Sequence, residues 1–371
     1  MASNIGLPSL SIVFEKAAQA AANRSKRGYV GVFVRDTKAQ GVHSLSSAAL
    51  IPAELGADNQ AYIERAFTGS DRGQPSRVVA VVIAPQGEEN SDSTAAFEAG
   101  LGLIEGMSLD YIAGPPDMTA AEKTLLAEWA EGRRAQYFTE KAVIPNAATA
   151  PDSMGVIHFC ETDGSIAAGQ KTYTAAQYAS RIAGLLAGIP AGMSGTYAKL
   201  PELTAVTPRS ETELETAVNA GKLVLLHDGQ AAKIARGVNS LTAIPVNGKE
   251  DWRKIKIVEG MDLITYYLRT TIQNEYIGRY ANTYDNKCVL LTAITGFLQS
   301  LEGQGVLSPG ESWADIDEAA QERWMKSQGI ETAGMTAQQI REYQTGSWVF
   351  LRAGGRLVDA MEDFQVLFNN L

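Results

Sequence analysis

The sequence predicts a multi-domain α/β protein with a layered α/β core, a small β-rich N-terminal domain and extended terminal strand arms. The first observation is length, because 371 residues exceed what one small core accommodates. The second is an alternation of strand-like and helix-like segments through the middle of the chain, which is typical of a largely parallel sheet. The third is a short segment of alternating apolar residues near each end, set off by linker-like sequence.

These observations divide the chain into five expected parts. They are an N-terminal arm and linker at 1–27, a small β-rich domain at 28–76, an α/β domain at 77–250, a C-terminal α+β domain at 251–355 and a C-terminal strand arm at 356–371. An early strand from Tyr29 to Arg35, followed by a mixed segment from Ser44 to Ala66, defines the small domain.

The α/β domain opens with a continuous β-branched run from Arg77 to Ala84, as expected for a strand buried on both faces of a parallel sheet. Capping residues then mark where helices begin, because a Ser or Thr side chain satisfies free backbone N–H groups of the first turn. The expected caps are Thr119 with Glu122, Thr174, and Ser210 with Glu213. Further strands are expected at 109–113, 154–160 and 223–227.

The C-terminal domain changes to longer amphipathic helices. Apolar residues recur at helical spacing to about Asn282, and again from about Asn286 to Leu301. The remaining expected elements are a short strand at 255–258, an exposed helix within 309–329, a short charged helix at 336–343 and a strand at 348–351.

Both ends of the chain show the period-two alternation of a strand. The N-terminal alternation comprises Leu10, Ile12 and Phe14, and the stretch from Ala17 to Lys26 behind it is typical of a linker. The C-terminal alternation comprises Phe364, Val366 and Phe368, preceded by the glycine pair Gly354 and Gly355. A lone strand cannot satisfy its own backbone, so each must add to a sheet edge in its own subunit or in a neighbour.

Composition excludes several classes of function. A net charge of -10 argues against a nucleic-acid-binding protein, which needs a basic excess. The longest apolar runs fall short of the ~18 residues of a membrane span, and the first residues do not resemble a signal peptide. The two cysteines, Cys160 and Cys288, lie in apolar runs and predict buried free thiols rather than a disulfide framework.

No motif predicts catalysis, a cofactor or a metal. The glycine-rich stretch from Gly188 to Gly195 lacks the lysine of a phosphate-binding loop. His158 and Cys160 share one face of a predicted strand without a recognisable nucleophile motif. His227 and Asp228 end a predicted strand, where α/β sheets place their sites, so an α/β enzyme with a site there remains an alternative. A monomeric binding module is a further one.

Several stretches resemble tail sheath proteins of myophage-like and defective-prophage contractile particles. The strongest is Trp252-Arg-Lys-Ile-Lys-Ile-Val-Glu-Gly-Met-Asp-Leu-Ile. The opening Gly6-Leu-Pro-Ser-Leu-Ser-Ile-Val-Phe-Glu-Lys and the closing Val358-Asp-Ala-Met-Glu-Asp are similar to the ends of those proteins. The resemblance covers nearly the whole chain, although none of these stretches is a catalytic fingerprint.

The resemblance implies a structural, non-enzymatic subunit that assembles in the bacterial cytoplasm into a virion or tail-like particle. Such subunits form a homo-oligomer of sixfold rings around an inner tail tube protein, with baseplate and terminator proteins, and without nucleic acid or membrane. Their terminal arms, here residues 8–16 and about 356–369, exchange strands with neighbours. The linker at 17–26 and the pair Gly354 and Gly355 would then absorb the rotation on contraction.

Overall fold

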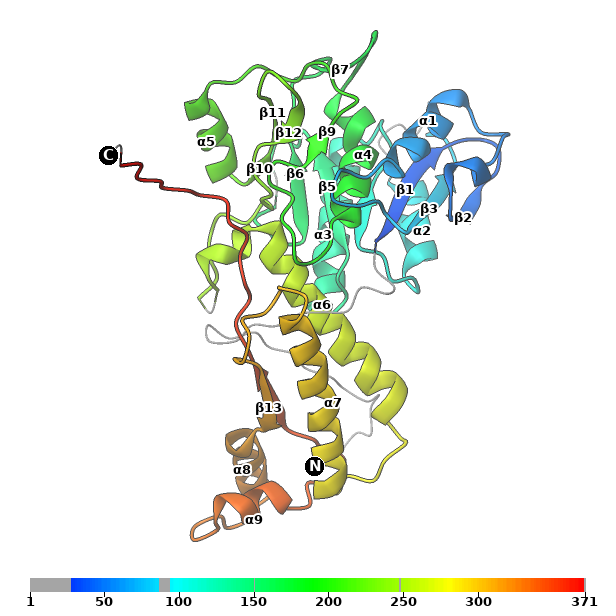
Figure 1. Cartoon of the computed structure of the whole chain (residues 1–371). Helices are drawn as coiled ribbons and strands as arrows, with labels where there is room; N and C mark the ends of the chain where they lie inside the picture. Colours follow the sequence, from blue (N-terminus) through cyan, green and yellow to red (C-terminus); the bar gives the residue numbers. More distant parts are fainter. Residues whose placement is uncertain (1–27, 87–93, 150, 247, 370–371) are drawn as a thin grey trace. The chain divides into compact units, whose positions relative to one another are not determined.

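The computed structural model describes residues 28–86, 94–149, 151–246 and 248–369 (Figure 1). Contacts divide these residues into two compact units. Of the described residues, the sheet unit contains those from Gly28 to Glu259 together with 359–369, and the helical unit is Gly260–Val358. Each unit has its own secondary structure, and each is described in turn.

A seven-stranded sheet organises the sheet unit, in the strand order β10-β6-β5-β4-β1-β3-β2. Every neighbouring pair is parallel except β2, which runs antiparallel to β3. The strands are β1 (Tyr29–Arg35), β2 (Gly41–Leu45), β3 (Arg77–Ile83), β4 (Tyr111–Ala113), β5 (Lys141–Pro145), β6 (Val156–Phe159) and β10 (Lys222–Leu223). This confirms the predicted layered α/β core.

Helices cover both faces of this sheet because successive strand residues point to opposite sides. On β1, Val32 joins the apolar cluster on one face, whereas its neighbour Phe33 joins the cluster on the other. The first face packs against α1 (Ala57–Ala66) and α4 (Ala175–Gly188), and the second packs against α2 (Ala95–Ile104) and α3 (Ala120–Ala135). The sheet therefore lies between two helical layers (Figure 1).

The expected helix caps are all present. Thr119 and Glu122 form a capping box at the start of α3, and Thr174 forms one with Gln177 at the start of α4. Ser210 and Glu213 cap α5 (Glu211–Asn219) in the same way. Local sequence therefore specifies where these helices begin.

Short antiparallel pairs complete the sheet unit. One three-stranded sheet has the order β11-β12-β9, and a separate hairpin joins β7 to β8. Their bounds are β7 (Ile166–Ala168), β8 (Lys171–Tyr173), β9 (Lys199–Leu200), β11 (Leu225–His227) and β12 (Ala232–Ile234). The predicted strand at 223–227 is thus split between β10 of the large sheet and β11 of the small one.

Residues 28–76, which were expected to form a separate small domain, are part of the large sheet. Their strand β1 lies between β4 and β3 near the middle of the large sheet, and β2 forms the sheet edge beside β3. The segment therefore belongs to the same core as residues 77–250, because a central strand has no independent core of its own. The boundary expected at 250 also moves, to 259, which lies within α6 (Ile255–Thr271).

The helical unit contains the two long helices that periodicity predicted, α6 and α7 (Tyr284–Glu302). A π-helical turn, η4 (Ile272–Tyr276), follows α6, and the rings of Tyr267 and Phe297 stack. The rest of the unit is β13 (Trp313–Ile316), α8 (Glu318–Ser327), α9 (Ala337–Glu342) and β14 (Leu351–Gly354).

Three expected elements of this region are wrong or displaced. Residues 255–258, expected as a strand, form the first turn of α6. The single helix expected within 309–329 is strand β13 followed by the shorter α8. The strand expected at 348–351 begins at Leu351 and ends at Gly354. At 255–258, strand propensity gives way to packing, which commonly overrides it.

Candidate assembly surface

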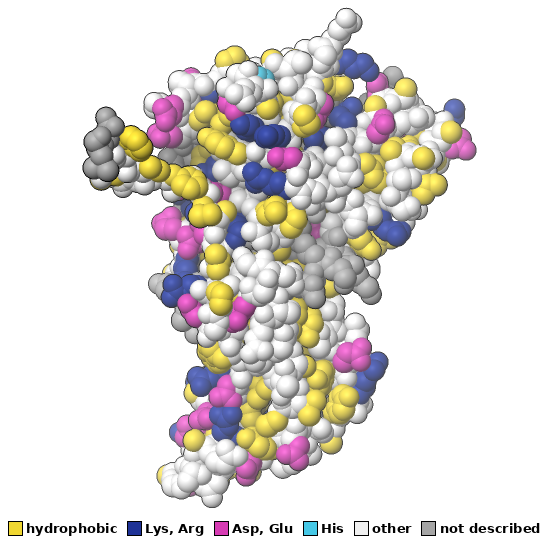
Figure 2. Space-filling model, viewed as in Figure 1, with side chains coloured by type: hydrophobic (Ala, Val, Ile, Leu, Met, Phe, Trp, Pro, Cys, Tyr) yellow, Lys and Arg dark blue, Asp and Glu magenta, His cyan; other side chains and the backbone are white. Residues whose placement is uncertain are grey.

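The C-terminal segment carries apolar side chains into solvent. Over the described residues 359–369 the chain forms neither helix nor strand, and Phe364, Val366, Leu367 and Phe368 are between 74% and 85% exposed. Figure 2 shows hydrophobic side chains along this extension. Solvent-exposed apolar residues in a row mark an interaction site, because burying them is strongly favourable. We call residues 364–369 the C-terminal arm.

Directly before the arm, the chain is held on the sheet unit by charged contacts. Arg236 donates through Nε to Glu362 Oε2 at 3.1 Å and through Nη2 to Asp363 Oδ2 at 2.6 Å. Ser194 Oγ donates to the other oxygen of Glu362 at 2.5 Å, and Lys254 forms an ion pair with Asp359. Residues 359–363, which we call the acidic strap, are therefore anchored, whereas the arm is not.

A two-stranded ribbon in the helical unit offers sheet edges. Strands β13 and β14 pair antiparallel, from Trp313 opposite Gly354 to Ile316 opposite Leu351. Pairing continues beyond them, because Ser308 N donates to the carbonyl of Arg356 at 2.8 Å. Within the described residues this sheet has two strands, and an isolated two-stranded ribbon is marginal in water.

The two glycines expected as a linker lie inside this paired ribbon. Gly354 ends β14, and both Gly354 and Gly355 are buried. A Cβ on Gly354 would meet the Trp313 ring at 2.6 Å, so glycine is required there for packing. The structure therefore places both glycines in paired, packed backbone, and this pairing continues past residue 356, the expected start of the arm, to Leu357. The expected N-terminal residues Leu10, Ile12 and Phe14, with the linker at 17–26, lie outside the described residues.

Buried charges anchor the start of α6 to the large sheet. Lys141 of β5 is fully buried, and its Nζ lies 3.1 Å from Oε1 of Glu259. Tyr111 of β4 donates its hydroxyl to the same carboxylate oxygen at 2.7 Å. Sequence analysis missed this network, although a lysine at the start of the apolar run Lys141-Ala-Val-Ile is the signal that points to a buried partner.

The alternative site at His227 and Asp228 has the geometry of a turn. His227 is exposed at the end of β11 and accepts a hydrogen bond on Nδ1 from Gly229 N at 3.1 Å. The Asp228 carboxylate accepts from Gln230 N and Ala231 N, both at 2.9 Å, and pairs with Lys233. The hydrogen bond from Lys233 holds the pKa of Asp228 below its usual range, so this carboxylate is a poor base.

His158 and Cys160 are unsuited to nucleophilic chemistry. Burial lowers the pKa of His158 to about 4, so the imidazole is neutral near pH 7. Burial raises the pKa of Cys160 to about 11, which leaves the thiol protonated at the same pH. A thiolate is the reactive form of cysteine, so this pair lacks an activated nucleophile.

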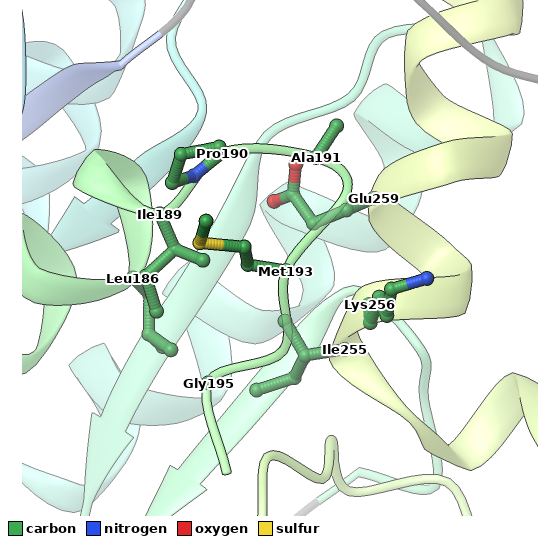
Figure 3. Close-up of a pocket in the computed structure, with 9 residues that line it drawn as sticks. All are labelled: Leu186, Ile189, Pro190, Ala191, Met193, Gly195, Ile255, Lys256 and Glu259. Carbon is green, nitrogen blue, oxygen red and sulfur yellow. The ribbon is translucent and has the colours of Figure 1, made fainter. Parts of the chain in front are cut away.

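A small hollow lies between the end of α4 and the first turns of α6 (Figure 3). Its lining is mainly aliphatic, from Leu186, Ile189 and Ile255. Figure 3 shows the Lys256 ammonium directed away from these side chains, and Glu259 is already bound to Lys141 and Tyr111. The hollow thus lacks the converging polar groups that orient a small ligand.

In residues 28–86, 94–149, 151–246 and 248–369, no helix is both long and apolar enough to cross a membrane. Over the same residues, no group of three or more His, Cys, Asp or Glu side chains is arranged to hold a metal ion.

Comparison with solved structures identifies the fold as that of contractile sheath subunits. The chain superposes on the contracted helical sheath of the anti-feeding prophage with a TM-score of 0.65 at 14% identity, covering 100% of this chain and 99% of that one. It superposes on the sheath tail protein of Desulfitobacterium hafniense with a TM-score of 0.65 at 15% identity, covering 83% and 94%.

Sequence comparison extends this from fold to family. The tail sheath protein of Clostridium phage phiCD119 is 31% identical over 366 residues, which cover 97% of this chain and 98% of that protein. A family model described as the phage tail sheath C-terminal domain matches residues 248–369. The chain belongs to the phage tail sheath protein family.

Proposed function

We propose that this protein is the structural subunit of a contractile tail sheath. Copies stack as rings around an inner tail tube, and shortening of the sheath drives that tube through a target cell envelope. The observation that carries the proposal is the 31% identity to a phage tail sheath protein along 97% of the chain. The likeness to sheaths in the contracted state supports it at the level of the fold.

The copies are linked by strand exchange through the terminal arms. The exposed C-terminal arm supports this step, because a segment with alternating apolar residues gains both backbone pairing and burial when it joins a sheet. The edges of the β13–β14 ribbon are suitable acceptors in a neighbouring copy, since a two-stranded ribbon gains stability from a further strand. Leu10, Ile12 and Phe14 form the second arm of this proposal.

Further partners follow from the same role. The inner tail tube protein, the baseplate and the terminator proteins contact the sheath, and the subunits assemble in the bacterial cytoplasm. The protein is not an enzyme in this proposal, which is supported by the turn geometry at Asp228 and the protonated thiol of Cys160. A net charge of -10 also disfavours contact with nucleic acid.

A deletion of residues 364–371 tests the exchange step. It removes the C-terminal arm but keeps the acidic strap and the β13–β14 ribbon, so the body should fold normally. The expected result is loss of tubes in negative-stain electron micrographs, with an unchanged circular dichroism spectrum. Normal tubes from the truncated protein would exclude exchange through this arm.

A triple substitution with a matched control tests the same step without shortening the chain. Replacing Phe364, Val366 and Phe368 by serine should also prevent tubes, because the arm keeps its backbone but loses its apolar contacts. Met361→Ser is the matched control, since Met361 is 87% exposed but lies in the strap rather than the arm. Tubes should persist in that control.

A further inference from the structure

We propose that the acidic strap, residues 359–363, is an electrostatic latch that fixes the point at which the C-terminal arm leaves its own subunit. The inference rests on the proposed role of the arm in strand exchange. It adds a regulatory contact inside one subunit, made by Arg236, Lys254 and Ser194, that governs how readily the arm reaches a neighbour.

Glu362 is the anchor of the latch. Its side chain is only 6% exposed, and its two oxygens accept from Ser194 Oγ at 2.5 Å and from Arg236 Nε at 3.1 Å. A carboxylate that is largely removed from water needs such partners, because an unpaired buried charge is strongly unfavourable. This side chain therefore holds the strap on the sheet unit as long as Arg236 is present.

Arg236 joins the anchor to the last residue before the arm. Its guanidinium reaches both oxygens of Asp363, with Nη1 to Oδ1 at 3.1 Å and Nη2 to Oδ2 at 2.6 Å. That hydrogen bonding lowers the pKa of Asp363, which keeps its carboxylate charged. The planar, two-point contact also sets direction, because a guanidinium and a carboxylate meet in a fixed geometry.

The second end of the strap is held separately. Lys254, immediately before α6, pairs with Asp359 four residues before Asp363. The strap is thus bound at both ends to residues of the sheet unit. Each ionic contact is partly open to solvent, with Asp363 77% and Arg236 30% exposed, so added salt weakens the latch.

The latch and the arm use different physical forces. The strap is held by charge, whereas residues 364–369 contain no charged residue and gain from burial and backbone pairing. A rigid exit point reduces the conformational entropy that the arm loses when it docks on a neighbour. Releasing the strap should therefore slow ordered assembly without removing any contact that the arm itself makes.

Arg236→Glu in the full-length protein tests the proposal. Hydrogen–deuterium exchange is measured on the unassembled subunit, and amides of residues 360–363 should exchange about tenfold faster than in the unmodified protein. Tube formation, followed by light scattering, should slow and produce shorter tubes. The double variant with Arg236→Glu and Glu362→Lys restores opposite charges. It should return both the amide exchange rate and the rate of tube formation toward those of the unmodified protein.

A matched control uses a second exposed ion pair. Arg279 Nη1 lies 3.2 Å from Glu275 Oε2 within the helical unit, and both residues lie more than seventy positions before the strap. Arg279→Glu should leave exchange at residues 360–363 and the assembly rate unchanged. Unchanged exchange in Arg236→Glu would overturn the latch, and faster exchange with normal assembly would overturn its regulatory role. Failure of the unmodified protein to form tubes would instead contradict the proposed function.

Discussion

At the scale of single residues, the strongest stability prediction concerns the buried pair Lys141 and Glu259. Glu259→Gln keeps the size of the side chain but removes the carboxylate that lies 3.1 Å from the buried Lys141 ammonium. We expect the free energy of unfolding to fall by about 3 kcal/mol, because removing one charge of a buried ion pair is strongly destabilising. Urea denaturation of the unassembled subunit, followed by circular dichroism, measures the loss.

An exposed ion pair is the control for that substitution. Arg279 and Glu275 lie four residues apart, 3.2 Å between Nη1 and Oε2, and both side chains are 61% exposed. Glu275→Gln should change the free energy of unfolding by less than about 0.5 kcal/mol. Equal losses from the two substitutions would show that Glu259 is not compensating a buried charge.

His158 gives the protein a pH-dependent stability. Its pKa is about 4 in the folded protein, mainly because it is buried, against about 6.5 in an unfolded chain. As pH falls, the unfolded state therefore binds the proton first. The contribution of neutral His158 to stability is fully present above pH 6.5 and decreases toward pH 4. His158→Gln should remove roughly 3 kcal/mol of that decrease between pH 7 and pH 4.

The measurement is the difference between variant and parent protein in urea titrations at several pH values. Carboxylates that titrate below pH 4.5 affect both proteins and cancel in the difference. His227→Gln is the control for replacing a histidine by glutamine, because His227 is exposed at the end of β11. If stability depended on pH in the same way in His158→Gln and in the parent protein, burial of His158 would not be the cause of the pH dependence.

Sequence alone identified the arm residues Phe364, Val366 and Phe368 as apolar and alternating, and the structure places all three in solvent. It did not identify the strap. In the sequence, Glu362 and Asp363 have the character of ordinary surface residues. Only the fold brings Arg236, more than a hundred positions earlier, into contact with their carboxylates. Pairings over such a distance depend on the whole fold.

At the scale of elements, Gly354 is the position where one methyl group should matter most in the β13–β14 ribbon. Gly354→Ala places a Cβ 2.6 Å from the Trp313 ring, so the indole must move. We expect a loss of about 1–3 kcal/mol in the free energy of unfolding and a shift in tryptophan fluorescence. Both follow from overpacking in a ribbon that is only two strands wide.

Gly296 in α7 provides the matched control within the same unit. A Cβ at this exposed helical position meets nothing within 4 Å. Gly296→Ala should stabilise the protein by about 0.5–1 kcal/mol, because alanine is the better helix former. Destabilisation by both substitutions to the same extent would contradict the packing explanation for Gly354.

Local signals predicted elements well where caps and periodicity agree, as at Thr119 before α3 and along α7. They failed at 255–258, where three of the four residues have strand propensity but form the first turn of α6. Those residues are buried on all sides, so neither helical nor strand periodicity is visible there. Packing against the sheet decides the outcome.

At the scale of the whole molecule, the parallel α/β core was predictable from alternating elements, but its strand order was not. The first strand of the chain, β1, lies inside the sheet between β4 and β3, which no local pattern indicates. A separate domain at 28–76 was therefore expected where the chain instead contributes two strands to one large sheet. Topology of this kind depends on long-range pairing.

The most direct test of the central claim is negative-stain electron microscopy of the purified full-length protein at high concentration. The measurement is made with and without a co-expressed inner tail tube protein. The account predicts long, hollow, striated tubes, formed more readily when the tube protein is present. Monodisperse particles under both conditions would contradict the assignment of this chain as a sheath subunit.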